Sequence, residues 1–245
     1  MGDNWLDIAQ NFLFPPVCLL CDGHGGDRAS QSGLDLCTSC LNELPYLNGA
    51  VCTGCAMPIT ADRSQSQRLF CGQCLQHRYE FDAVMAVFQY QTPLDYLIQG
   101  LKYNDRLVNA RLLGCLMGRY LLANVTSRPD GLIPVPLHKN RLRERGYNQS
   151  LEIARYIAQE LALPILSNAC VRQRQTTSQT GLSIKERRKN VQKAFVCKGS
   201  MSGCYIVIID DVMTTGSTVN ELARELKRAG ARKVDVWVCA RALIL

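Results

Sequence analysis

The cysteine pattern constrains the fold of this chain more than any other feature of the sequence. Eight of the thirteen cysteines follow one spacing twice: C-x2-C, fifteen residues, then C-x2-C again, with the second copy displaced by 34 residues. A C-x2-C turn puts two thiolates on one side of a metal ion, and a second turn about fifteen residues later completes a tetrahedron. We therefore predict two structural zinc sites. Their ligands, paired sequentially, are Cys18, Cys21, Cys37 and Cys40 for one ion and Cys52, Cys55, Cys71 and Cys74 for the other.

Spacing alone leaves two alternatives open. An interleaved cross-brace would use the same eight cysteines in another pairing. A disulfide framework is disfavoured because the N-terminal residues lack a secretory signal and a reducing cytosol opposes disulfides. His24 and His77 lie near the clusters, but both quartets are complete without them. We interpret the other five cysteines as single buried thiols in apolar surroundings; they are Cys115, Cys170, Cys197, Cys204 and Cys239.

The cysteine-rich region has the wrong charge for a module that binds nucleic acid by itself. Residues 18–80 carry four arginines, no lysine and six acids, a net charge of −2. A module that bound phosphate backbones alone should be basic. A scaffold or a protein-docking role is therefore the better interpretation of this region.

After residue 80, apolar strands alternate with amphipathic helices. Central strands with almost no polar residues predict a parallel sheet covered by helices on both faces. The expected strands lie within 81–90, 131–136, 164–172, 203–211 and 233–243, and the expected helices within 92–103, 106–125, 149–163 and 218–231. We predict an N-terminal helix at 1–17, a double zinc-ribbon module at 18–80 and an α/β domain at 81–245. The sequence contains no run of eighteen apolar residues, so we predict no membrane span and expect a cytoplasmic protein.

Two adjacent acids, Asp210 and Asp211, come at the end of an expected strand, and a loop of small hydroxyl residues follows them. Ligands of such sheets bind at the carboxyl ends of the strands. The loop Thr214–Thr218 leads into an expected helix, whose N-terminal N–H groups favour a phosphate. It lacks the lysine of an ATPase P-loop. Because two adjacent carboxylates suit vicinal hydroxyls, we predict a ribose 5-phosphate site.

These residues resemble a known pattern. The stretch "VIIDDVMTTGST" resembles the phosphoribosyl pyrophosphate (PRPP) motif of type I phosphoribosyltransferases. Together with "PVPLHKNRLRERGYNQS" and "TTSQTGLSIKERRKNVQKAF", it resembles the ComF/GntX family, in which a cysteine-rich zinc module precedes a phosphoribosyltransferase-like domain. The resemblance runs from Cys18 to Ala240 and implies the fold of a type I phosphoribosyltransferase.

The resemblance also implies roles for individual residues. Asp210 and Asp211 would hold the ribose hydroxyls, directly or through Mg²⁺. The 5-phosphate would be bound by Thr214, Thr215, Gly216, Ser217 and Thr218. The diphosphate loop would be Val135, Pro136, Leu137 and His138, with Arg141, Arg143 and Arg145 close by. A mobile loop at 174–190 would close over the diphosphate with Arg174, Thr176, Gln179 and Arg187.

The distribution of charge agrees with a polyanionic ligand. Residues 138–146 carry a net charge of +3 and residues 172–193 carry +6, whereas the whole chain carries +7. The rest of the chain is therefore net negative, at −2. A nucleic-acid backbone is the rival interpretation of the same basic segments.

Two functions follow from the resemblance. In the first, a PRPP-binding protein acts in DNA uptake and transfers phosphoribose to an acceptor that the sequence does not identify. In the second, an accessory protein reuses the fold to bind single-stranded DNA or a helicase-type DNA-uptake protein, peripheral to the inner face of the membrane. A catalytic transfer would displace diphosphate at the anomeric carbon, with positive charge developing on the sugar.

Overall fold

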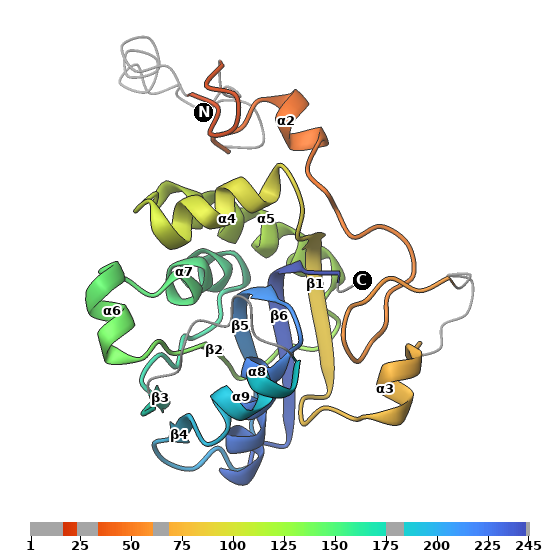
Figure 1. The fold of residues 1–245 in the computed structure, drawn as a ribbon, viewed down its shortest axis with the longest axis vertical. Coiled ribbons are helices and arrows are strands. Elements are labelled where there is room, and N and C mark those ends of the chain that lie inside the picture. The colour runs from red at the N-terminus through yellow and green to blue at the C-terminus, as the bar shows by residue number, and fades with distance from the viewer. Residues whose placement is uncertain (1–16, 24–33, 61–68, 175–183, 244–245) are drawn as a thin grey trace.

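A four-stranded parallel sheet forms the centre of the molecule (Figure 1). The computed structural model describes residues 17–23, 34–60, 69–174 and 184–243. The strands of the sheet are β1 (Ala83–Gln89), β2 (Gly131–Pro134), β5 (Tyr205–Met213) and β6 (Lys233–Arg241). They lie in the order β1-β6-β5-β2, and every neighbouring pair is parallel. The predicted α/β class is confirmed.

Helices cover both faces of this sheet, as predicted. They are α4 (Leu94–Tyr103), α5 (Val108–Asn124), α6 (Lys139–Arg145), α7 (Gln149–Leu161), α8 (Ile184–Val191) and α9 (Ser217–Arg228). On one face α5 and α7 pack on the sheet and α4 lies against α5, while α9 packs on the other face with α8 against it. Within the described part of the chain, no helix is both long and apolar enough to cross a membrane.

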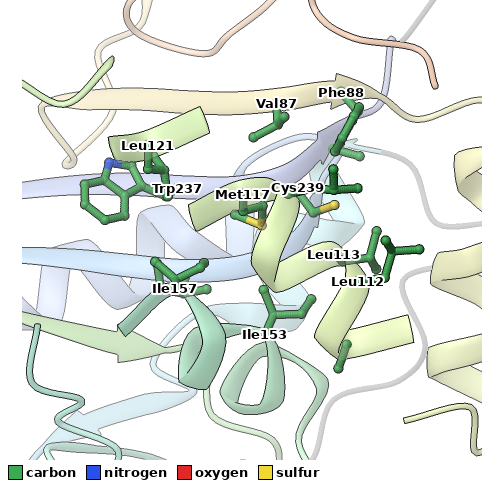
Figure 2. Close-up of a cluster of buried hydrophobic side chains, with 14 of the residues drawn as sticks. Val87, Phe88, Leu112, Leu113, Met117, Leu121, Ile153, Ile157, Trp237 and Cys239 are labelled. Carbon is green, nitrogen blue, oxygen red and sulfur yellow. The ribbon is translucent and has the colours of Figure 1, made fainter. Parts of the chain in front are cut away.

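One hydrophobic core lies between the sheet and the helices α4, α5 and α7 (Figure 2). Val207 and Ile209 of β5 and Trp237 of β6 belong to it, and all three are buried. A glycine lets α5 approach α7 closely, because a Cβ at Gly114 would lie 2.8 Å from the carbonyl oxygen of Ile153. Each fully buried apolar side chain of this core stabilises the fold by roughly 1.5–3 kcal/mol.

A second core lies on the opposite face, under α9. Alternate residues of the same strands point into this second core, including Ile206 and Ile208 of β5 and Val236 of β6. This alternation follows from the two-residue period of a strand. Val219, Leu222 and Leu226 of α9 complete the layer, as the periodicity of the sequence predicts.

The two cysteine quartets pack on different sides of the sheet. Cys18 belongs to the core that contains α5, whereas Cys52 belongs to the core under α9. Each quartet has one short helix, α2 (Thr38–Asn42) in the first and α3 (Gly72–Gln76) in the second. The chain between them runs antiparallel to β1, with Leu47 N–H donating to the Val87 carbonyl at 2.9 Å. This segment covers the edge of the sheet at β1, which would otherwise expose unpaired backbone groups.

The expected strand at 164–172 is not a strand of the main sheet. Only β3 (Cys170–Arg172) is regular, and it pairs antiparallel with β4 (Phe195–Cys197), which the sequence did not predict. Ile165 makes one isolated bridge to Leu132 of β2. In the sequence, β3 precedes α8 and β4 follows it, so this separate strand pair brings together the two ends of the chain segment that contains α8.

Two other boundaries differ from the predictions. β5 continues through Asp210 and Asp211 to Met213, because β6 pairs with it along the whole length. Residues 139–145, for which no helix was predicted, form α6, which ends at Gly146, whose φ of 78° suits glycine. The predicted helix at 1–17 lies outside the described residues apart from Val17, and the predicted domain boundary at residue 80 stays a prediction.

Candidate functional site

The two acids of β5 lie at the carboxyl end of the sheet and have different partners. Asp210 is half-buried and accepts a hydrogen bond from the Ser150 hydroxyl of α7 at 3.0 Å. Asp211 is 3% exposed, and its Oδ1 lies 3.0 Å from the Lys102 ammonium of α4. Within the described residues, Asp211 Oδ2 has no hydrogen-bond partner although it is buried. An orphaned carboxylate oxygen fits a site that a cation or a hydroxyl group completes.

The two acids and Lys102 affect one another's pKa values. Burial raises the pKa of Asp210 to about 7, and the adjacent Asp211 charge adds to the shift against the opposing Lys102. Burial also disfavours the Lys102 ammonium, but the ion pair with Asp211 outweighs it and the pKa of Lys102 is raised. A cation bound beside Asp210 would favour its ionised form, because it would oppose the effect of burial.

The connection between β2 and α7 forms the next wall of the site. Asn148 caps α7 by accepting the Ser150 N–H at 3.1 Å, and its amide donates to the Val135 carbonyl at 3.0 Å. The predicted diphosphate loop, Val135 to His138, is thereby tied to the helix that holds Asp210. His138 caps α6, since its Nδ1 accepts the Asn140 N–H at 3.3 Å. This gives the ring of His138 a structural role that the sequence did not indicate.

The hydroxyl loop Thr214–Thr218 joins β5 to α9, as predicted. Gly216 has a φ of 73°, and a Cβ there would lie 2.7 Å from Met213 Cε, so the turn requires glycine. The hydroxyls of Thr215 and Ser217 are 2.8 Å apart. The N-cap residue of α9, Gly216, has no side chain to cap the helix, and the Thr215 hydroxyl accepts the Ser217 N–H at 3.4 Å, so the positive end of the helix lies beside the loop. Hydroxyls, a helix N-terminus and a close backbone approach are the features of a phosphate cradle.

Two residues from outside the loop support it. Arg241, the last residue of β6, is 4% exposed and donates from Nη1 to the carbonyls of Met213 and Thr214. Its Nε donates to the Cys55 carbonyl at 2.7 Å, so one side chain joins the loop to the second cysteine quartet. Tyr79 donates to the Thr215 carbonyl at 3.3 Å. The loop is therefore attached to the cysteine-rich region as well as to the sheet.

A group of arginines lies near Asp210. Burial lowers the pKa of Arg172 on β3, and the Arg141 and Arg174 charges lower it further while Asp210 opposes the shift. Arg141, Arg174 and Asp210 therefore lie within electrostatic range of the Arg172 guanidinium. Arg172 was not predicted, whereas Arg141 and Arg174 were. The cluster provides the positive charge that a diphosphate requires.

The other predicted anion-binding residues are arranged differently. Arg143 of α6 is exposed, and Arg145 donates to Gln149. Arg174 also donates to the carbonyls of Lys189 and Asn190 at the end of α8. Thr176 and Gln179 lie outside the described residues, as does the side chain of Arg187. Their predicted contacts stay predictions.

The eight repeat cysteines form two compact groups. The structure gathers Cys18, Cys21, Cys37 and Cys40 in one group and Cys52, Cys55, Cys71 and Cys74 in the other, with the sulfurs of each group within 4.8 Å of one another. This is the sequential pairing and not the interleaved one. The sulfurs of Cys21 and Cys37 are 3.8 Å apart, and those of Cys55 and Cys71 are 3.6 Å apart. A tetrahedron with Zn–S bonds of about 2.3 Å has edges of roughly 3.8 Å, so both groups fit zinc.

One cysteine of each group has a lowered pKa, whereas burial or neighbouring thiols raise the pKa of Cys21, Cys40, Cys55 and Cys74. Burial alone would raise the pKa of Cys18, but N–H donors of Cys37, Cys21 and Leu20 outweigh it and hold the pKa at about 6. The pKa of Cys71 is lowered to about 7, again by hydrogen bonds that outweigh burial. The compact grouping of four sulfurs in each site supports structural zinc, and a bound metal would stabilise the thiolate form of its ligands.

A cavity of about 750 Å³ adjoins the hydroxyl loop on the α9 side. Gln73 and Gln76 of α3 and the adjacent His77 line it, as do Thr215 and Ser217 of the hydroxyl loop. His77 is exposed and belongs to neither quartet, in keeping with its interpretation as a surface residue. The second cysteine quartet thus contributes a wall to a cavity that reaches the phosphate cradle.

Comparison with known proteins agrees with this arrangement. A model of the double zinc ribbon domain matches residues 9–75, and a model of the phosphoribosyl transferase domain matches residues 147–243. Competence protein F of Haemophilus influenzae is 33% identical over 84% of this chain and 96% of its own length. The chain belongs to the ComF/GntX family. Another ComF/GntX relative, DNA utilization protein YhgH of Escherichia coli O157:H7, is 35% identical over 94% of this chain and 98% of its own.

More distant members and solved structures extend the comparison. Competence protein ComFC of Bacillus subtilis is 26% identical over 87% of this chain and 90% of its own. Among solved structures, a glutamine PRPP amidotransferase from B. subtilis is 19% identical over 57% of this chain and 30% of its own, with a TM-score of 0.40. The ComF/GntX assignment agrees with the resemblance found in the sequence.

Four functional candidates escaped sequence analysis: Lys102, Arg172, Arg241 and Tyr79. Each is a single polar residue on an expected helix, strand or connection, without a local motif around it. Only the tertiary fold brings them to the acids and the hydroxyl loop. The one sequence signal was the excess of basic charge at 172–193, which includes Arg172.

Proposed function

We propose that this ComF/GntX protein binds PRPP at the end of β5 and acts in DNA uptake. The observation that carries the proposal is the acid pair beside a helix N-terminus with a hydroxyl loop. Asp210 and Asp211 would hold the ribose hydroxyls with Mg²⁺, which supplies charge neutralisation for the diphosphate when bound. Loop residues Thr214–Thr218 would bind the 5-phosphate. Two zinc ions, held by the eight repeat cysteines at 18–80, would stabilise the module that precedes the phosphoribosyltransferase-like domain at 81–245.

The chain's own residues would divide the remaining tasks. Arg141, Arg172 and Arg174 would bind the diphosphate, because they provide a cluster of positive charge near Asp210. Lys102 would be displaced from Asp211 or would contact the ligand itself, since its ammonium lies against the acid that the ligand would use. Asp211 is buried, which would exclude water from its side of the sugar-binding position.

The first prediction concerns PRPP affinity. Titration calorimetry of the wild-type protein with PRPP and Mg²⁺ should show one site per chain. Asp210→Asn combined with Asp211→Asn should weaken binding roughly a hundredfold or more, because two hydroxyl acceptors and the charge of the site are lost. Asp95→Asn is the matched control, since this acid lies in the first turn of α4, at the opposite end of the helix from Lys102. Its affinity should equal that of the wild type, and an absence of PRPP binding by the wild type would refute the proposal.

The names of the relatives support a role with DNA. One is a competence protein and another is a DNA utilization protein. We extend the proposal to single-stranded DNA as a ligand and to a helicase-type DNA-uptake protein as a partner, in the cytoplasm at the inner face of the membrane. The exposed bases Lys139 and Arg143 of α6 would contact phosphates, because they lie outside the cluster near Asp210.

The second prediction concerns DNA. Fluorescence anisotropy with a labelled single strand should give an affinity that falls steeply with salt. Lys139→Ala combined with Arg143→Ala should weaken binding at low salt and reduce the salt slope by about one to two. Lys198→Ala with Arg232→Ala removes the same charge from exposed positions at the opposite end of the sheet and should change little. A salt-independent affinity would contradict DNA binding through this surface.

A further inference from the structure

Two cysteines outside the quartets face each other across β3 and β4. The sulfurs of Cys170 and Cys197 lie 2.9 Å apart, although they are 27 residues apart in the sequence. The five remaining cysteines are therefore not all single thiols, which corrects the sequence-based interpretation. Hydrogen bonds from Gln173 N–H to the Ala194 carbonyl and from Lys198 N–H to the Ala169 carbonyl flank the pair. Cys170 and Cys197 thus occupy a position without its own ladder hydrogen bonds.

That position has the geometry of a cross-strand disulfide. Directly opposite residues at a non-hydrogen-bonded position of an antiparallel pair have Cα atoms about 4.5 Å apart. Disulfides join Cα atoms at roughly 4.4–6.8 Å, so the backbone of β3 and β4 already meets the requirement. The register of β3 and β4 and the 2.9 Å between the sulfurs are therefore compatible with a disulfide.

The two thiols differ in exposure and acidity. Cys170 is 2% exposed, whereas Cys197 is half-buried and reaches the surface. The hydrogen bond between them raises the pKa of Cys170 and lowers that of Cys197. Cys197 is therefore the thiolate that a small molecule can reach, and Cys170 is the buried thiol that can resolve a mixed disulfide.

We propose that Cys170 and Cys197 form a reversible disulfide, with a low-molecular-weight disulfide as the oxidant. The Cys197 thiolate attacks one sulfur of the oxidant, and the oxidant's S–S bond breaks to release one thiol. Cys170 then loses its proton and attacks the Cys197 sulfur, which expels the second thiol. The protein loses two electrons and two protons, and the oxidant is reduced to two thiols; excess thiol reverses both steps.

The disulfide would act on the arginine cluster. Arg172 is the residue of β3 two positions after Cys170, and its guanidinium lies 5.4 Å from the ring centre of Phe195 on β4. A bond between the strands would fix the position from which Arg172 approaches Asp210. Oxidation should therefore change PRPP affinity severalfold, and this consequence rests on the proposed function.

The test uses the full-length, zinc-loaded protein. It is equilibrated with oxidised glutathione, alkylated with iodoacetamide, digested without reduction and analysed by mass spectrometry. We expect one cross-linked peptide that joins Cys170 to Cys197 while zinc stays at two ions per chain. Alkylation of both cysteines, a glutathione adduct on Cys197 alone, or release of zinc before the cross-link appears would each overturn the proposal.

Thermal melting gives a second measurement with a matched control. Oxidation should raise the melting temperature by about 5–10 °C in the wild type, because the bond closes a loop of 27 residues. The same rise is expected in Cys204→Ser, whose thiol is half-buried and donates to the Ser202 carbonyl at 3.7 Å. It should be absent in Cys197→Ser, and an equal rise there would overturn the proposal.

Calorimetry separates this inference from the proposed function. If the reduced protein fails to bind PRPP while the cross-linked peptide forms, the proposed function is wrong and the disulfide stands. If the reduced protein binds PRPP and no cross-link forms, the disulfide is wrong and the proposed function stands. Equal affinities of the oxidised and reduced forms would refute the coupling through Arg172.

Discussion

Replacing Cys52 with serine is expected to remove one of two zinc ions and to unfold the second cysteine quartet. The Cys52 sulfur is fully buried and accepts the Cys71 N–H at 3.2 Å. A structural zinc ion contributes on the order of 10 kcal/mol of binding free energy, which is comparable with the stability of a whole domain. Elemental analysis should find one zinc per chain instead of two. The melting temperature should fall by about 10 °C or more.

Two further variants make this prediction specific. Cys204→Ser changes a half-buried thiol outside the quartets and should keep both zinc ions and the wild-type melting temperature. Cys21→Ser should also lose one ion, but Cys21 is exposed and its quartet packs with the core on the other face of the sheet from α9. Its effect on ligand binding should be smaller than that of Cys52→Ser. Two zinc ions retained in Cys52→Ser would contradict the assignment of this ligand.

Replacing Arg241 with methionine is expected both to destabilise the protein and to weaken ligand binding at the hydroxyl loop Thr214–Thr218. Arg241 donates to the carbonyls of Cys55, Met213, Thr214 and Ala242 from a nearly buried position. A methionine of similar length leaves these buried acceptors without a donor, at a cost of about 3–5 kcal/mol. Urea denaturation measures this loss. The affinity for PRPP should also fall roughly tenfold or more, because the loop loses its support.

The matched control is Arg232→Met, which removes an exposed guanidinium that donates to the Gly203 carbonyl. This variant should change neither stability nor affinity by more than about 0.5 kcal/mol. Arg241→Lys keeps the charge but lacks the fork of donors, so it should recover only part of both losses. An Arg241→Met protein with wild-type stability and affinity would show that the carbonyls find other donors.

Much of the fold could be predicted because its signals are local. The apolar run of β5, the spacing of Val219, Leu222 and Leu226 on α9 and the repeated C-x2-C turns each depend on a few neighbouring residues. The strand pair β3–β4 could not be predicted, because each strand has three residues and owes its pairing to the other. The apolar stretch around Ile165 has the composition of a sheet strand but forms only one bridge.

The candidate site likewise contains residues that could be predicted from the sequence and residues that could not. Asp210, Asp211 and the hydroxyl loop form one continuous motif and are visible in the sequence. Lys102 and Arg241 approach that motif from α4 and from the end of β6, where nothing near them in the sequence marks their function. His138 stands in a basic segment that suggested a ligand contact, yet its ring caps a helix. Residues that are distant in the sequence but complete the candidate site could therefore be identified only from the structure.

The order of strands in the sheet has a consequence for how the chain folds during synthesis. The two inner strands, β5 and β6, come from the last forty-one residues, and the outer strand β1 pairs only with β6 within the sheet. Residues 83–89 must therefore wait for residues 233–241 before they gain a partner strand within the parallel sheet, which makes assembly of the sheet slow and late. A ribosome would release the cysteine-rich segment long before the sheet exists. Metal loading can then precede sheet assembly, and a chain that lacked β6 would leave both β1 and β5 with an open edge.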